Sequence, residues 1–126
     1  VDCNQNIVIY KNGLGYGQPA DLVFYNYNTQ NQIVRRLPST SYAIEYYFLS
    51  ADRVIYTDVR DAYQIPNYGS SQMDIYEYNY LTQTERILVK DMGVATVKQI
   101  KQGKLLFNIQ NPNGGVYGWD LYWRNL

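Results

Sequence analysis

The strongest constraint on the fold is an internal repeat of short, strand-like segments. One pattern, polar residues followed by two apolar residues and an aromatic one, recurs at residues 6–11, 52–57 and 103–108. A second pattern opens with aspartate and recurs at residues 21–27, 74–80 and 120–126. Equivalent residues are 46 to 53 positions apart in both series, so the chain repeats with one period near 50 residues.

Each repeat is predicted to be a meander of short antiparallel strands. In the central unit, strands are expected near residues 42–49, 54–58, 74–80 and 85–90, with tight turns at 50–53 and 81–84 and a long loop at 59–72. Tyr, Val and Ile favour pleated surfaces, and no stretch of 12 residues carries a helical stripe. We therefore predict an all-β repeat domain over residues 1–126, with a partial unit at 6–38, a complete one at 41–91 and a partial one at 94–126.

These units resemble the blades of TolB-like β-propellers. The resemblance rests on Asp-Ile-Tyr-Glu-Tyr-Asn-(x)₂-Thr at residues 74–82, which follows Arg-Val-Ile-Tyr-Thr-Asp at 53–58. Similar blades form the propeller domains of prolyl-oligopeptidase-type enzymes. The family pattern usually has Gly after the Thr of the outer turn, where this chain has Gln30 and Gln83. The resemblance implies a scaffold or a peptide-binding platform, with no catalytic residue inside the blades.

The number of units conflicts with a closed propeller. The chain supplies about two and a half blades, whereas propellers close with roughly four to eight. Three explanations stay open: a piece of a longer propeller, strands completed by copies of the chain or by a partner, or a small β-sandwich or barrel. Long aromatic edge strands left unpaired invite association.

The composition removes most catalytic chemistry. The chain has no histidine and one cysteine, so Ser-His-Asp and Cys-His catalysis lack their imidazole, and the usual zinc ligands are missing. Asp58 and Asp61 supply too few oxygens for Ca²⁺ and are expected to lie in a solvated turn with Arg60. We predict a protein that is not an enzyme and needs no cofactor or metal.

The charge balance argues against polyanionic partners. Lys plus Arg and Asp plus Glu both total 11, so the formal net charge is zero. Nucleic-acid surfaces and polybasic membrane patches carry a basic excess. No apolar run approaches the ~18 residues that span a bilayer, so we expect neither nucleic-acid binding nor a membrane span. Cys3 is expected to be a free thiol in a frayed N-terminus.

The candidate binding residues lie on three loops that join second to third strands, at residues 12–20, 59–72 and 111–118. Exposed aromatic residues on glycine-rich loops offer flat stacking area to sugars or peptides. The alternative is that the glycines serve tight hairpins and that the tyrosines pack over the rim. The candidates are Tyr16, Tyr63, Tyr68 and Tyr117 on the loops, and Trp119 directly after the third loop.

The remaining repeated residues are predicted to be structural. Tyr76, Tyr78 and Tyr80 alternate along a strand and should share one face, opposite Ile75 and Glu77. That face is predicted to pack between units, or alternatively to form an aromatic ladder between subunits. The repeated aspartates should accept backbone N–H bonds; they are Asp21, Asp74 and Asp120.

The sequence as a whole predicts a non-catalytic scaffold or binding module, extracellular or periplasmic. Its expected partners are other protein chains, through self-assembly or the missing blades, with carbohydrate or peptide as further candidates. Two alternatives remain: a structural subunit of an extracellular filament completed by strand pairing between chains, and the propeller portion of a larger hydrolase.

Overall fold

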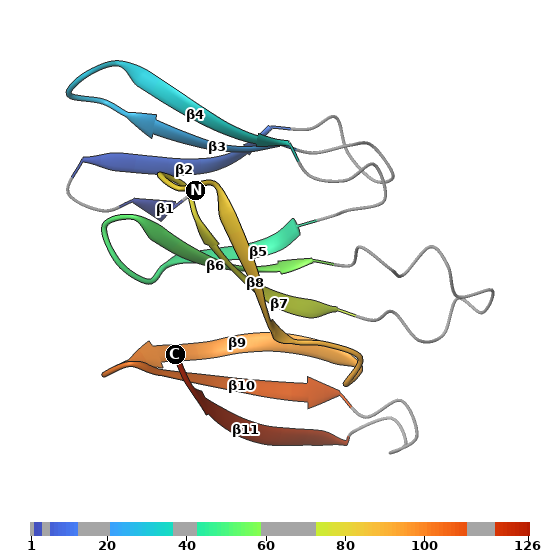
Figure 1. Cartoon of the computed structure of the whole chain (residues 1–126). Coiled ribbons are helices and arrows are strands. Elements are labelled where there is room, and N and C mark those ends of the chain that lie inside the picture. The colour runs from blue at the N-terminus through green and yellow to red at the C-terminus, as the bar shows by residue number, and fades with distance from the viewer. Residues whose placement is uncertain (1, 4–5, 13–20, 37–42, 59–72, 111–117) are drawn as a thin grey trace.

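The computed structural model describes residues 2–3, 6–12, 21–36, 43–58, 73–110 and 118–126. These residues form antiparallel strands and tight turns, and none of them is helical. Three open sheets lie face to face in a stack (Figure 1). The prediction of an all-β fold built from antiparallel meanders is confirmed.

Each sheet is a meander whose spatial strand order follows the sequence. Sheet A contains β1 (Asp2–Cys3), β2 (Ile7–Asn12), β3 (Asp21–Asn26) and β4 (Asn31–Arg36). Sheet B contains β5 (Ala43–Phe48), β6 (Arg53–Asp58), β7 (Asp74–Asn79) and β8 (Thr84–Val89). Sheet C contains β9 (Val94–Lys101), β10 (Lys104–Gln110) and β11 (Trp119–Asn125).

The register of the strands follows the sequence repeat. The aromatic residue of the first pattern lies opposite the third residue of the second pattern in every sheet: Tyr10 opposite Val23, Tyr56 opposite Tyr76, and Phe107 opposite Tyr122. The last two pairs also stack in the same way, with ring centroids 5.4 and 5.7 Å apart and an interplanar angle of 19° in both. Residues aligned by the repeat are therefore equivalent in space, and we call them equivalent below.

The turn between the third and outer strands is also repeated. The Asn26 side chain accepts hydrogen bonds from the backbone N–H groups of Asn28 and Thr29, at 3.0 and 3.1 Å. Its equivalent, Asn79, accepts them from Leu81 and Thr82, both at 3.0 Å. Each turn then passes through a left-handed glutamine.

The outer turns place glutamine in a backbone region that glycine usually occupies. Gln30 and Gln83 have φ of 59° and 58°, a backbone region that costs side-chain-bearing residues energy and that glycine adopts freely. The turn geometry is therefore the one that favours Gly, although this chain places Gln there. The β9–β10 hairpin uses Gln102 and Gly103 in the same region, with φ of 50° and 71°.

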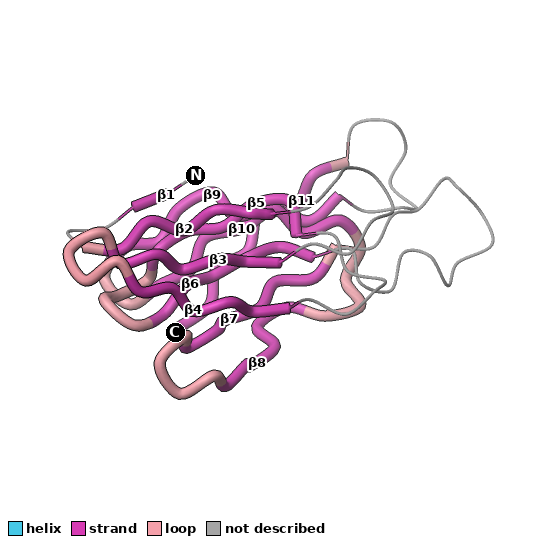
Figure 2. The backbone as a smooth tube through the Cα atoms, turned by 90° about the horizontal axis from the view of Figure 1, so that it is seen from above, coloured by secondary structure: helices cyan, strands magenta, loops and turns pink. Residues whose placement is uncertain are grey.

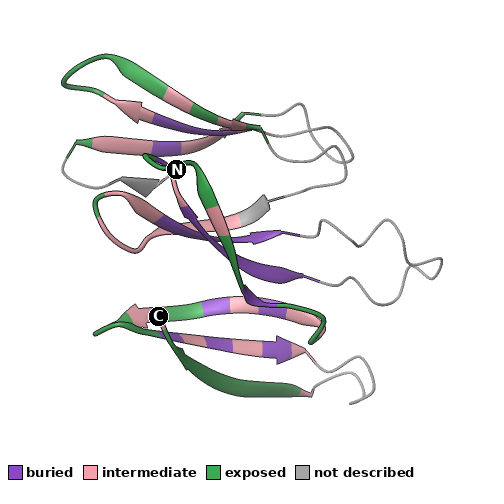
Figure 3. Ribbon diagram, viewed as in Figure 1, coloured by how far each residue is buried: buried purple, intermediate pink, exposed green. Residues whose placement is uncertain are grey.

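Two hydrophobic cores hold the stack together (Figure 3). The first lies between sheets A and B and contains Ile9, Leu22, Phe24, Val54, Tyr56, Tyr76, Tyr78 and Tyr80. The second lies between sheets B and C and contains Ile55, Ile75, Leu88, Val89, Ala95, Val97, Leu105, Phe107 and Ile109. Sheet B is thus covered on both faces, whereas sheets A and C each bury one.

The sheets share one orientation along the stack. Viewed along the stack, β1, β5 and β9 lie toward one side, and β4 and β8 lie toward the opposite side (Figure 2). Close approaches between sheets involve the first strand of the following sheet, β5 against β1 and β9 against β6 and β7. The first strands of successive sheets therefore lie near one another along one side of the stack.

Two details differ from the sequence prediction. Sheet A has a short fourth strand, β1, in which Cys3 lies opposite Val8 instead of in a frayed end. Asp58 is fully buried instead of solvated, because it is the last residue of β6 and pairs between Ala43 and Asp74. The other strands begin or end within one or two residues of the predicted bounds.

Candidate interaction site

The loops predicted to bind a ligand fall largely outside the described residues. Tyr16, Tyr63, Tyr68 and Tyr117 lie in the stretches 13–20, 59–72 and 111–117, so their role stays a prediction. Trp119 is described, and it is the first residue of β11 rather than part of a loop. Its side chain lies on the outward face of sheet C.

The outward face of sheet C carries a stripe of exposed apolar side chains. Trp119, Leu121 and Trp123 alternate along β11 and are 48%, 66% and 63% exposed. Residues two apart in a strand share a face, so these three point away from the core together. The intervening residues face the stack, where Tyr122 stacks on Phe107 and Arg124 donates to the Leu88 carbonyl of sheet B.

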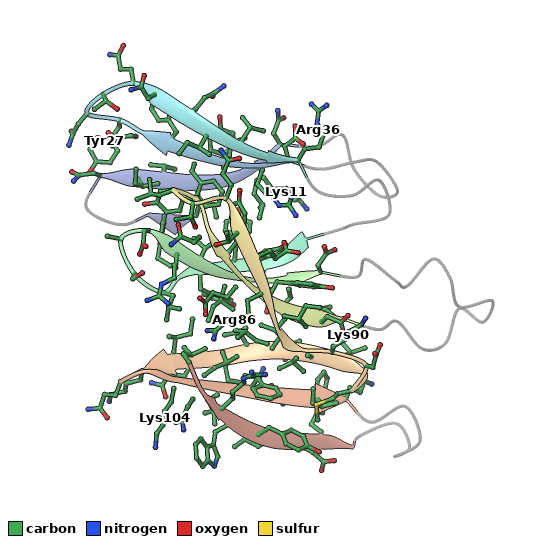
Figure 4. All side chains as sticks on the ribbon, in the orientation of Figure 1. Lys11, Tyr27, Arg36, Arg86, Lys90 and Lys104 are labelled. Atoms are coloured by element: carbon green, nitrogen blue, oxygen red, sulfur yellow. The ribbon has the colours of Figure 1, made fainter. Side chains whose placement is uncertain are left out.

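Leu106 extends this stripe on the neighbouring strand, because it lies opposite Trp123. We call Leu106, Trp119, Leu121 and Trp123 the C end face. Lys104 lies at the turn end of sheet C (Figure 4), with its ammonium 4.8 Å from the centroid of the Trp123 ring. A cation over an indole face is a modest attraction at an exposed site and leaves most of the ring available.

The outward face of sheet A is apolar and rich in tyrosine. Ile9, Leu22 and Phe24 point into the first core, so the residues that alternate with them point outward. We call this outward set the A end face; it consists of Val8, Tyr10, Val23, Tyr25 and Tyr27. Val23 is buried within it, and Tyr27, at the turn end of sheet A (Figure 4), is 46% exposed.

Polar contacts accompany the aromatic packing between sheets A and B. The Arg35 guanidinium lies 3.3 Å from the Glu85 carboxylate and 5.3 Å from the centroid of the Tyr78 ring. The Tyr56 hydroxyl donates to the same carboxylate. Burial raises the pKa of the Tyr78 hydroxyl; the Arg35 charge opposes this shift and the Glu85 charge adds to it. Sheets A and B are therefore joined by an ion pair and a hydrogen bond as well as by aromatic packing.

Sheet B carries charge at one position where sheets A and C carry an aromatic residue. Glu77 is equivalent to Phe24 and Trp123, and it lies between two guanidinium groups, Arg53 at 3.3 Å and Arg86. Arg86 lies in the space between sheets B and C (Figure 4). The Glu77 side chain is buried, while both arginines are about half exposed. Their positive charges offset the cost of burying the charged Glu77 carboxylate.

Two of the repeated aspartates form contacts that stabilise the fold. Asp74 accepts a hydrogen bond from the backbone N–H of Asp91 at 3.1 Å, as predicted for the repeated aspartates, and lies opposite the buried Asp58. Asp21 pairs instead with Arg36 at 3.5 Å. Within the described part of the chain, no group of three or more His, Cys, Asp or Glu residues could hold a metal ion.

A short network closes the β5–β6 turn. The Ser50 hydroxyl lies 2.7 Å from one Asp52 oxygen, and the Asn79 side-chain amide donates to the other at 2.8 Å. The Tyr80 hydroxyl donates to the Ala51 carbonyl. The Ser50 hydrogen bond is the largest cause that lowers the pKa of Asp52 below its ordinary value. This turn is therefore stabilised by an ionised carboxylate.

Comparisons with known proteins give no family for this chain. No protein-family model, no curated protein and no solved structure matches it. Of the residues that the structure describes, none belongs to a helix long and apolar enough to cross a membrane. The resemblance to TolB-like blades stays a prediction from the sequence.

The sequence pattern points to the loops as the candidate site and does not by itself identify the two end faces. The last strand was predicted to begin at residue 120, and Trp119 was predicted as a binding residue without its neighbours Leu121 and Trp123. The signal was present as an apolar residue at every second position from 119 to 123. It could not be assigned to a face until the structure showed which side of sheet C meets sheet B.

Proposed function

We propose that this chain is a non-catalytic, blade-like binding module that engages a protein partner through the end faces of its sheet stack. One observation carries the proposal: the C end face exposes Leu121 and Trp123, whereas their equivalents, Leu22 and Phe24 in sheet A and Ile75 and Glu77 in sheet B, are buried. Contiguous exposed apolar surface of this kind marks interaction sites.

The chemistry of the face suits a protein surface. Tryptophan and tyrosine dominate the residues that contribute most to protein–protein affinity, because they bury large area with little loss of conformational freedom. Inside the chain, the equivalent positions of sheets A and B are covered by neighbouring sheets, and the covering faces are rich in tyrosine and aliphatic residues. A sheet of a protein partner is therefore favoured over a sugar, which would stack on isolated rings.

The two tryptophans provide a direct test, because both belong to the C end face and the chain has no others. Their quenching by acrylamide is measured at increasing protein concentration, and with added oligosaccharides or tyrosine-rich peptides. We expect shielding by protein or peptide and loss of that binding in Trp123→Ser. At a low protein concentration, where association does not add to stability, the thermal unfolding of this variant should be unchanged.

Two results would refute the proposal. In the first, the tryptophans stay fully quenchable under every condition while Trp123→Ser lowers the thermal stability. This result would show that Trp123 stabilises sheet C and binds no partner. In the second, oligosaccharides alone provide the shielding, which would make the face a sugar-binding surface. The predicted loop site is tested separately, since Tyr63→Ala and Tyr117→Ala should leave binding to the C end face unchanged.

The filament subunit and the hydrolase propeller remain alternatives, as does the extracellular or periplasmic location. The filament alternative depends on strand pairing at sheet edges, whereas the proposal depends on the faces. Substitutions at Trp119 and Trp123 therefore separate the two, because they alter a face and leave the backbone of the edge strand β11 unchanged.

A further inference from the structure

The C end face is equivalent to a face that is already covered inside the chain. Sheet A presents Ile9, Leu22 and Phe24 to sheet B, where all three are buried. The repeat aligns these residues with Leu106, Leu121 and Trp123 of sheet C. The C end face is therefore a second version of the surface on which sheet B lies.

The A end face is equivalent to the opposite half of the same interface. Sheet B presents five residues to sheet A: Val54, Tyr56, Tyr76, Tyr78 and Tyr80. Their equivalents in sheet A form the A end face: Val8, Tyr10, Val23, Tyr25 and Tyr27. Three of these five positions hold tyrosine in sheet A, compared with four in sheet B. The two end faces thus match each other as the two halves of one repeated interface.

We propose that a second copy of this chain binds head to tail, with the C end face of one copy on the A end face of the other. The proposal rests on the proposed function and names its partner. Inside the chain, the Phe24 ring lies 4.7 Å from Tyr80 and 5.8 Å from Tyr78, measured between centroids. By equivalence, Trp123 of one copy packs on Tyr27 and Tyr25 of the other.

Two copies can close on each other through two such interfaces. A head-to-tail contact forms a ring where the rotation closes and a filament where it does not. The described residues of each copy form three sheets, so a pair has six such sheets, within the roughly four to eight that close a propeller. Three copies would have nine and exceed that range. The common orientation of β1, β5 and β9 toward one side of the stack (Figure 2) is the one that a closed ring requires.

The charges of the chain do not oppose this association. The formal net charge is zero, so two copies approach without long-range repulsion. A symmetric contact between two C end faces would instead leave the tyrosines of both A end faces uncovered. The head-to-tail arrangement covers both kinds of face at once, and for this reason we prefer it.

The first test is the mass in solution by light scattering. The unchanged protein should have twice the 14.7 kDa mass of one chain. Trp123→Glu and Tyr27→Glu each place a charge in both interfaces and should give single chains, with affinity lowered about thirtyfold or more. Both side chains are substantially exposed, and circular dichroism checks that the variants fold. Leu81→Glu, in the exposed β7–β8 turn away from both end faces, is the matched control and should remain a pair.

Mixing the two variants separates the head-to-tail contact from a symmetric one. Trp123→Glu keeps a normal A end face and Tyr27→Glu keeps a normal C end face, so an equimolar mixture should form a pair although neither variant does so alone. A Tyr27→Glu variant that still associates would show contact between C end faces, which overturns this inference and leaves the proposed function standing. A single-chain mass for the unchanged protein at its highest soluble concentration overturns the inference, as does a large open polymer. The acrylamide titration then decides the proposed function by itself.

Discussion

Replacing Phe24 by alanine tests whether the stack is held by the interface between sheets A and B. The Phe24 ring is 2% exposed and stacks on Tyr80 at 4.7 Å and 20°. Truncation of a buried phenylalanine removes its burial and leaves a cavity, which costs about 3–5 kcal/mol. A domain of this kind has a free energy of unfolding of about 5–15 kcal/mol. Phe24→Ala should therefore remove a fifth or more of the stability.

The matched control is Trp123→Ala, at the equivalent position of sheet C. The Trp123 side chain is 63% exposed, so most of its area is in water in the single chain. Exposed substitutions of this kind usually change the free energy of unfolding by about 0.5 kcal/mol or less. Truncating the aromatic residue at one repeat position should therefore have very different costs in the two sheets, because a second sheet covers Phe24 and none in the chain covers Trp123.

Both variants are best measured in the Tyr27→Glu background, where no association adds to stability. Urea unfolding followed by far-UV circular dichroism gives the two free energies, and similar m-values show that the exposed surface is unchanged. Equal losses for the two variants would refute the equivalence argument. A loss below about 1.5 kcal/mol for Phe24→Ala would show that sheet A does not depend on this core.

Three further substitutions test local features. Glu77→Gln keeps the shape of the side chain and removes the charge between Arg53 and Arg86. It should lower the free energy of unfolding in urea by about 1–2 kcal/mol, and an unchanged value would contradict the role of the ion pairs. Gly103→Ala should cost about 1 kcal/mol through backbone strain alone, because φ is +71° and no atom lies within 4 Å of the added Cβ; equal melting temperatures would exclude the strain. The lowered pKa of Asp52 means that the folded chain binds fewer protons than the unfolded chain near pH 3.8, so this carboxylate contributes stability above that pH and loses it as the pH falls through the folded pKa. Asp52→Asn should therefore flatten the decline in stability below about pH 4, and an unaltered pH profile would count against the turn network.

The repeat made much of the fold predictable. The strands predicted from the repeat around Tyr10, Tyr56 and Phe107 are observed, and all three pair in the same register, because a shift by one residue would move the apolar set to the wrong face. The alternation of Tyr76 with Glu77 likewise predicted which side chains would share a core. The short strand β1 was missed because two residues carry no periodicity to detect.

The candidate site was less predictable, for a physical reason. Tyr25 and Tyr78 are equivalent in sequence and both were predicted to be structural. Sheet A covers Tyr78, whereas Tyr25 lies on the outward face of sheet A, at one end of the stack. Whether an aromatic residue is core or surface depends here on its place in the stack. That information is absent from the local pattern, which is the same in both repeats.

The two covered faces of sheet B also imply a gradient of local opening along the stack. Stability in repeat architectures is approximately a sum over units and their neighbours, so the unit with two neighbours should open last. Amide hydrogen exchange of the single chain should be slowest in β6 and β7, whose side chains are buried from Val54 to Asp58 and from Asp74 to Tyr78. Sheets A and C should exchange sooner and act as separable cooperative units. Addition of a second copy would slow exchange mainly at the two ends.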